Sequence, residues 1–130
     1  MASPTARTLS RLRASGYLAA VVERWLPRVN KRQDLFGCID IVAVRQGIIG
    51  VLGVQATSLS HLSDRIAKAR SRRELVTWLA AGNTFEVWAW GKTPEGRWHV
   101  RRVALVRSDL RGMAWTPRAR TRRPRQPELF

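Results

Sequence analysis

The sequence is short of cysteine and of long apolar runs, and each shortage excludes a class of protein. The one cysteine, Cys38, has no partner for an internal disulfide, and no cysteine and histidine cluster has the spacing of a zinc site. No apolar run approaches the roughly 20 residues of a membrane-spanning helix, and the N-terminus lacks a signal-peptide core. We therefore expect a cytoplasmic protein with no membrane partner, in which Cys38 is a small buried side chain.

Acidic residues are also few. Lysine and arginine number 24 while aspartate and glutamate number 9, so the formal charge is +15. Such an excess disfavours a compact state through self-repulsion and indicates a polyanionic partner, with nucleic acid as the first candidate. Hydrophobic residues make up 45% of the 130 residues, which is enough apolar surface for a folded core.

The pattern along the chain predicts one α/β domain over residues 1–115 and a basic, disordered tail over residues 116–130. Ser3 and Pro4 predict the start of a helix that ends before Gly16. The predicted order is helix, three strands, helix, two strands, which favours a central mixed five-stranded sheet flanked by helices. The strands are expected at 17–25, 35–44, 48–57, 84–90 and 98–106, a basic loop at 28–34, and a helical region at 58–79 that breaks near 70–72.

Polar side chains interrupt two apolar strands in the middle of this pattern. Asp40 lies within the apolar run 39–44, and Gln55 and Thr57 alternate on one face of the next strand. Glu23 or Asp34 can add a second carboxylate. Such oxygen ligands suit Mg²⁺ or Mn²⁺, which neutralises charge and activates water in phosphodiester hydrolysis. The alternative is that Asp40 is a buried hydrogen-bonding carboxylate and that Gln55 and Thr57 are ordinary strand residues.

The runs Ile39-Asp-Ile-Val-Ala43 and Val54-Gln-Ala-Thr-Ser58, joined by a turn and followed by a basic helix, resemble the PD-(D/E)XK nuclease superfamily. The Holliday-junction resolvase and Mrr-like branches are the most similar, and the resemblance covers roughly residues 5 to 90. It implies a restriction-endonuclease-like fold, a homodimer, and a divalent metal bound by Asp40, Gln55 and the main-chain carbonyl of Ala56.

The chain departs from that family at two places. Thr57 stands where the family has lysine, so Lys68 or Arg65 is expected to supply the missing charge. Residues 4–15 also lack the glutamate of the resolvases, so Glu23 or Asp34 is expected to replace it. The predicted catalytic residues are Asp40, Gln55, Thr57 and Glu23, and the predicted metal ligands are Asp40, Gln55, Ala56 and Asp34.

Basic residues flank the predicted site on both sides. A single basic helix face is usually just solvated, but two sets around an acidic site indicate a groove for the phosphates of DNA. Six tryptophans are many for this length; an exposed one can stack on a base, whereas most are expected to pack in the core. The predicted DNA-binding residues are Lys31, Arg32, Arg65, Lys68, Arg70, Arg72 and Arg73.

The last five residues, Gln126-Pro-Glu-Leu-Phe130, resemble the pentapeptide with which bacterial replication and repair proteins dock in the sliding clamp. The resemblance implies that Gln126 contacts the pocket rim and that Leu129 and Phe130 fill the apolar pocket, while Pro127 stands where leucine is commoner.

The sequence thus predicts a metal-dependent DNA endonuclease, with branched DNA as one candidate substrate. The alternative is a catalytically inactive DNA-binding accessory protein on the same fold, tethered to a sliding clamp. A basic RNA-binding module is the third.

Overall fold

The structure, a computed structural model, describes residues 2–110, and the proposed domain boundary at 115 and the whole tail lie outside this range. The chain opens with helix α1, Pro4–Ala14. The Oγ atom of Ser3 accepts a hydrogen bond of 3.1 Å from the amide of Ala6, so Ser3 caps this helix as the sequence predicts.

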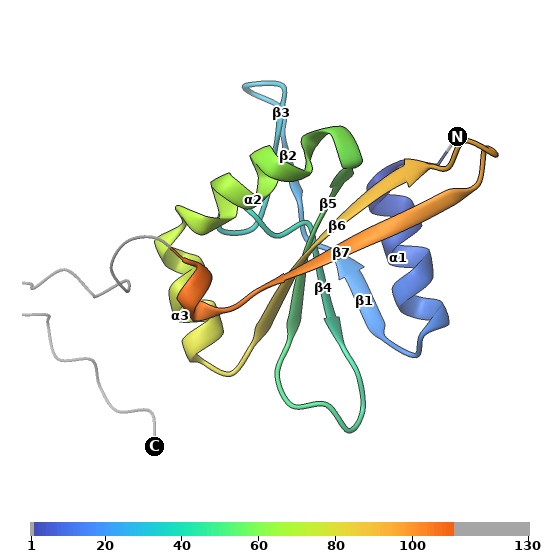
Figure 1. Cartoon of the computed structure of the whole chain (residues 1–130). Coiled ribbons are helices and arrows are strands. Elements are labelled where there is room, and N and C mark those ends of the chain that lie inside the picture. The colour runs from blue at the N-terminus through green and yellow to red at the C-terminus, as the bar shows by residue number, and fades with distance from the viewer. Residues whose placement is uncertain (1, 111–130) are drawn as a thin grey trace, which may run out of the picture.

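A five-stranded mixed sheet forms the centre of the molecule (Figure 1). Its strands lie in the order β1-β4-β5-β6-β7, and β5 and β6 are the parallel pair while the other neighbours are antiparallel. The α/β class and the mixed five-stranded sheet are therefore confirmed. The bounds are β1 Leu18–Val21, β4 Ile41–Val44, β5 Leu52–Ser58, β6 Thr84–Lys92 and β7 Trp98–Leu105.

The parallel strands β5 and β6 are joined by a helical crossover. The 3₁₀ turn η1 (Leu59–His61) leads into helix α2 (Leu62–Arg70), and helix α3 (Arg73–Ala80) follows after the predicted break. A second 3₁₀ turn, η2 (Arg107–Asp109), follows β7. Within residues 2–110 no helix is long and apolar enough to cross a membrane.

The two faces of the sheet are covered by different helices, so the domain has three layers. On one face, Phe85, Val87 and Ala89 of β6 pack with Leu62 and Leu75 of α2 and α3. On the other face, a second cluster packs against α1 and consists of Leu12, Ala19, Ile41, Ala43, Leu52, Val54, Trp88 and Trp90. The strand β6 is buried on both sides because it lies between two covered faces.

Part of the predicted strand pattern is wrong between residues 17 and 41. The strand expected at 17–25 ends at Val21, and its pairing with β4 extends by one further hydrogen bond of 2.7 Å, from the amide of Val22 to the carbonyl of Asp40. The expected loop at 28–34 contains a strand: β2 (Arg24–Leu26) and β3 (Lys31–Gln33) form a separate antiparallel hairpin.

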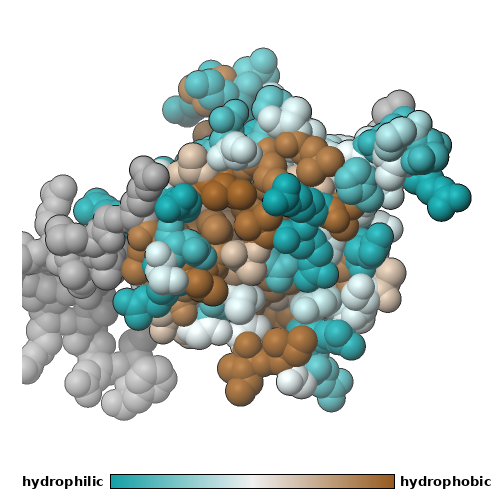
Figure 2. All heavy atoms as spheres, viewed as in Figure 1, coloured by the Kyte–Doolittle hydropathy of each residue, from teal (hydrophilic) through white to brown (hydrophobic). Residues whose placement is uncertain are grey.

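Two further strands begin later than predicted. The strand expected from residue 35 starts at Ile41, since Phe36 and Gly37 have φ values of 53° and 74° and form a turn. The strand expected from residue 48 starts at Leu52, after a loop that leaves the side chain of Ile49 95% exposed. This loop forms a hydrophobic projection at the lower end of the molecule in Figure 2.

Candidate metal centre

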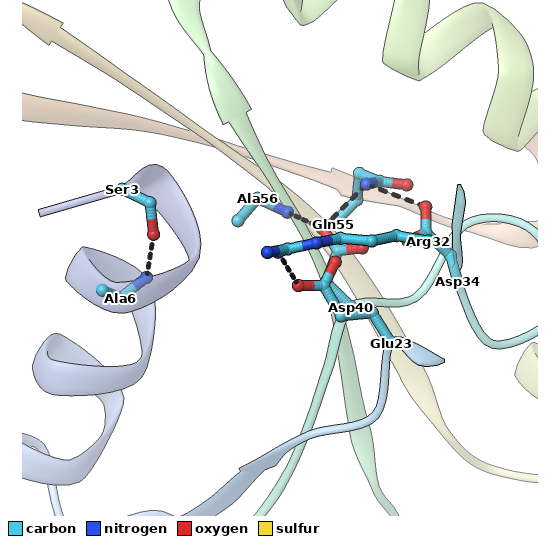
Figure 3. A network of polar contacts seen from close by, with 8 residues as sticks. All are labelled: Ser3, Ala6, Glu23, Arg32, Asp34, Asp40, Gln55 and Ala56. Atoms are coloured by element: carbon cyan, nitrogen blue, oxygen red, sulfur yellow. Dashed lines mark hydrogen bonds and ion pairs between the residues drawn. The ribbon is translucent and has the colours of Figure 1, made fainter. Parts of the chain in front are cut away.

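Asp40 and Gln55 face each other across the pair of strands β4 and β5. Ile41 is opposite Val54, so the preceding Asp40 lies opposite Gln55 and on the same face of the sheet. The amide nitrogen Nε2 of Gln55 donates to Oδ2 of Asp40 at 2.8 Å, and the backbone amide of Ala56 donates to the same oxygen at 3.0 Å. Asp40 is 3% exposed, and these two donors hold its carboxyl group in place (Figure 3).

Two more carboxylates reach Asp40 from the hairpin segment. Glu23 lies directly before β2 and Asp34 directly after β3. One oxygen from each of Glu23, Asp34 and Asp40 lies within 4.8 Å of the other two, and we call these three residues the acidic cluster. Gln55 also contacts Asp34, with 3.4 Å between Nε2 and Oδ2, so a single amide binds two of the three carboxylates.

The acidic cluster has an unusual proton affinity at Asp40. The pKa of Asp40 is raised from 3.8 to about 8, and burial is the largest cause of this rise. The hydrogen bond to Asp34 and the negative charges of Asp34 and Glu23 also contribute to the rise, whereas the hydrogen bond from the amide of Ala56 opposes it. At neutral pH the carboxyl group of Asp40 therefore retains its proton.

Arg32 is the cation in contact with the acidic cluster. Its Nη1 atom donates to Oε1 of Glu23 at 2.8 Å, and it reaches there from β3, beside Glu23 in Figure 3. The side chain of Arg32 is 69% exposed while that of Glu23 is 16% exposed. The ion pair is thus open to solvent on the arginine side, and little free energy holds the guanidinium there.

The arrangement of oxygens fits a hard divalent cation. Oxygen ligands lie about 2.0–2.1 Å from Mg²⁺ in an octahedron, so adjacent ligands are roughly 3 Å apart and opposite ligands roughly 4 Å apart. The carboxylate oxygens of the cluster, all within 4.8 Å, need to move by less than roughly 1 Å to meet these distances. Mg²⁺ and Mn²⁺ both accept such an all-oxygen set.

Four predicted site residues come together here, and three residues do not act as expected. Gln55, predicted as a metal ligand, turns its Nε2 atom toward the carboxylates of Asp34 and Asp40. Asp40, Gln55, Glu23 and Asp34 meet, so both candidate second acids join the cluster. Ala56 contributes its amide to Asp40, where the sequence analysis assigned its carbonyl to a metal. Thr57 is two residues after Gln55 in β5, so it is on the same face of the sheet. Its side chain was expected to be catalytic, but the residue is only 5% exposed.

The predicted DNA-binding residues fall into two groups. Lys31, Arg32, Lys68 and Arg73 are exposed. Arg70 and Arg72 support the fold as well, because their Nε atoms donate to the backbone carbonyls of Asp109 and Phe36 at 2.8 and 2.9 Å. Arg65, in the middle of α2, is partly buried and belongs to neither group.

The sequence analysis missed the contact between Arg32 and Glu23, and it missed the hairpin that carries it. The one available signal was the run Pro27 to Asn30, whose residue types favour a turn. The predicted clamp-binding residues Gln126, Leu129 and Phe130 lie outside the described residues.

In comparisons with known proteins, no family model, no curated protein and no solved structure matches this chain. The assignment of a function therefore depends on the geometry above and on general chemistry.

Proposed function

We propose that the protein is a divalent-metal-dependent deoxyribonuclease that hydrolyses phosphodiester bonds at the acidic cluster. The observation that carries this proposal is the convergence of Glu23, Asp34 and Asp40 within 4.8 Å in a chain of net charge +15. Carboxylates brought so close repel one another, and a cation relieves that repulsion. A positively charged surface around them suits a polyanion, and the cluster is placed to act on its phosphates.

The arrangement of strands supports the restriction-endonuclease-like fold that the resemblance implies. Asp40 and Gln55 lie opposite each other on an antiparallel pair, and the second strand of that pair continues through α2 and α3 to the parallel strand β6. This is the order in which the PD-(D/E)XK motif is expected to appear. On this basis we propose that the chain is related to the resolvase and Mrr-like branches.

Each residue of the site has a distinct part in the proposed reaction. Asp40, Asp34 and Glu23 would hold the cation, while the Gln55 amide and the Ala56 N–H fix the positions of the carboxylates. A cation bound there would supply charge neutralisation at the phosphate and activation of a water molecule. Thr57 has no charge to offer, so the positive charge beside the phosphate must come from another element.

The exposed basic residues at the two sides of the site provide the binding surface for DNA. Lys31 and Arg32 lie on β3, next to the cluster, and Lys68 and Arg73 lie on the crossover helices. Contacts of this kind position the phosphate backbone and carry no sequence information. Dimer formation and a tail tethered to a sliding clamp belong to this proposal as well.

Cleavage assays test the proposal directly. Wild type, Asp40→Asn and the exposed-carboxylate control Glu95→Gln are incubated with linear, flap and four-way-junction DNA in Mg²⁺ or Mn²⁺. We expect cleavage by wild type and Glu95→Gln, and at least a 100-fold loss in Asp40→Asn, since loss of a metal ligand removes several kcal/mol of transition-state stabilisation. Absence of wild-type cleavage with both metals refutes the enzymatic function.

A catalytically inactive DNA-binding accessory protein is the second candidate, and Thr57 favours it. The side chain at this position is neutral and 5% exposed, so it cannot replace a lysine. This candidate predicts DNA binding that is salt-sensitive and equal in EDTA and Mg²⁺. Competition of labelled DNA with unlabelled RNA separates both candidates from an RNA-binding module.

A further inference from the structure

The hairpin formed by β2 and β3 presents an exposed indole beside the acidic cluster. Trp25 is 52% exposed, and Trp88 and Trp90 are 2% and 6% exposed. The ring of Trp98, which is 38% exposed, is covered by the guanidinium of Arg7 at 3.7 Å and faces the ammonium of Lys92 at 5.2 Å. Among the described residues, Trp25 is thus the tryptophan with the most free ring surface.

The segment around Trp25 is strongly basic. Residues 24–32 contain four positive side chains and no aspartate or glutamate, and all four are exposed. Trp25 is directly opposite Arg32 in the hairpin register, so both side chains project from the same face of the hairpin, and both line the same hollow. The hairpin projects from the main body and is mostly hydrophilic at its tip (Figures 1 and 2). The positive residues are Arg24, Arg28, Lys31 and Arg32.

A shallow hollow links the indole to the acidic cluster. It has a volume of about 280 Å³ and is lined by Val21, Glu23, Trp25 and Arg32. A hollow of this size, just below the roughly 300 Å³ at which small-molecule pockets begin, suits a single planar ring better than a whole ligand. Glu23 belongs to both the hollow and the cluster, so a ring bound here lies next to the proposed reaction site.

We propose that Trp25 is a stacking platform for one unpaired base of DNA, and that the surrounding arginines and lysine bind the adjoining phosphates. Aromatic side chains stack on bases without regard to sequence, because every base has a π face. In a duplex the base faces are covered by their neighbours, so the platform selects DNA with unpaired nucleotides at a fork, flap, junction or free single strand. This inference rests on the proposed function and names the substrate class of that site.

The occupant is DNA because the hairpin combines an aromatic face with an uninterrupted positive charge. Tryptophan and arginine are also enriched in protein interfaces, but four cations with no aspartate or glutamate among residues 24–32 favour a polyanion as the partner. A lipid surface would need an apolar face backed by several hydrophobic side chains. The hairpin has Trp25 and Val29 as its exposed large hydrophobic residues among four cations.

Equilibrium binding in EDTA tests the platform without any cleavage. Fluorescence anisotropy compares a blunt duplex, the same duplex with two unpaired tails, and the free single strand. Trp25→Leu removes the π face, Trp25→Phe keeps one, and Trp98→Leu is the matched control at the other exposed tryptophan within residues 2–110. We expect Trp25→Leu to bind forked and single-stranded DNA at least fivefold more weakly, with less than a twofold change for the duplex, while Trp25→Phe stays within threefold of wild type.

The inference is overturned if Trp25→Leu keeps the wild-type affinity for forked DNA, or if it loses affinity equally for forked and blunt DNA. A second measurement uses the unaltered protein, so it does not depend on the folding of a variant. Photocrosslinking to 5-bromodeoxyuridine in an unpaired tail should place the adduct on the peptide containing Trp25. Adducts confined to other aromatic residues contradict the proposal.

These results separate the platform from the nuclease. If wild type cleaves duplex and forked DNA at equal rates and Trp25→Leu cleaves both as wild type does, the platform is refuted and the nuclease function stands. If the protein binds unpaired DNA selectively through Trp25 but cleaves no DNA, the nuclease function is refuted and the platform stands.

Discussion

The substitution Asp40→Asn should stabilise the folded protein at alkaline pH while it removes a metal ligand. The carboxamide oxygen can accept the two hydrogen bonds that Asp40 Oδ2 accepts now, from Gln55 Nε2 at 2.8 Å and from the Ala56 amide at 3.0 Å. The new NH₂ group can donate to Asp34, with which the carboxyl group of Asp40 now forms a hydrogen bond. Asp40→Asn therefore retains the hydrogen bonds of the folded state but removes the group that titrates.

The sign of this stability change follows from the raised pKa of Asp40. In the folded state this pKa is about 8 against 3.8 for an ordinary aspartate, so the folded protein holds a proton that the unfolded chain releases. The stability that this proton contributes is complete below pH 3.8 and is lost as the pH rises through about 8. Asparagine does not titrate, so the variant escapes this loss.

The size of the effect has a ceiling and a working value. A difference of about four pKa units at ~1.4 kcal/mol each sets a ceiling of about 6 kcal/mol. Relaxation of the surrounding side chains and entry of water reduce the cost of charging a buried carboxyl group, so most of that ceiling is not realised. We expect the free energy of unfolding of Asp40→Asn to exceed that of wild type by about 1–3 kcal/mol at pH 8, and to equal it within about 0.5 kcal/mol at pH 4.

Urea unfolding in EDTA at pH 4, 6 and 8 measures this difference, with Glu95→Gln as the control for loss of an exposed carboxylate. The midpoint for Asp40→Asn should move above that of wild type as the pH rises, while the two slopes stay equal. Parallel pH profiles for wild type and Asp40→Asn, or a variant that is less stable at pH 8, would refute the account of a proton held within the acidic cluster.

Three further predictions concern the metal, the fold and the DNA surface. Mg²⁺ at 100 times its Kd should stabilise wild type by about 2.7 kcal/mol at pH 8 and leave the melting temperature of Asp40→Asn unchanged. Gly50→Ala should destabilise the fold by about 2–4 kcal/mol in urea unfolding, because Gly50 has φ +92° and a Cβ there would collide with the Gly82 carbonyl. The control Gly47→Ala should cost only about 1 kcal/mol, because Gly47 has a similar φ of +88° but open space around it. The affinity for a duplex should fall with salt at a log–log slope near −5, if about six phosphates are neutralised, and each of Lys68→Gln and Arg73→Gln should reduce that slope by about 1 in anisotropy titrations.

Regular periodicity made several elements predictable from sequence. In β6 the apolar residues Phe85, Val87 and Ala89 alternate with Trp88 and Trp90, and the structure places the two sets on opposite faces. The break between α2 and α3 falls where a cluster of basic residues interrupts the apolar stripe. Cys38 is buried, and burial raises the pKa of its thiol to about 12, as befits a small hydrophobic side chain.

The hairpin of β2 and β3 had no such pattern. Its strands are three residues each and pair only with one another, and five of their six residues are exposed, so no alternation of apolar and polar residues marks them. The approach of Glu23 and Asp34 to Asp40 depends on how this hairpin folds back on the sheet. The pairing of Asp40 with Gln55 needed only a short turn between two neighbouring strands, which is why it could be predicted. Glu23 and Asp34 were predicted only as alternatives, and the sequence did not indicate that both would join Asp40.

The acidic cluster and the hairpin form one electrostatic unit, because Arg32 belongs to both. Three carboxylates within 4.8 Å are compensated in this structure by the guanidinium at Glu23 and by the proton on Asp40. Both compensations are weak in different ways: the arginine is 69% exposed, and the proton leaves near pH 8. A divalent cation at the cluster makes both unnecessary. Arg32 would then be free to meet a phosphate beside the base that we propose stacks on Trp25, and it would supply a positive charge that the neutral Thr57 does not.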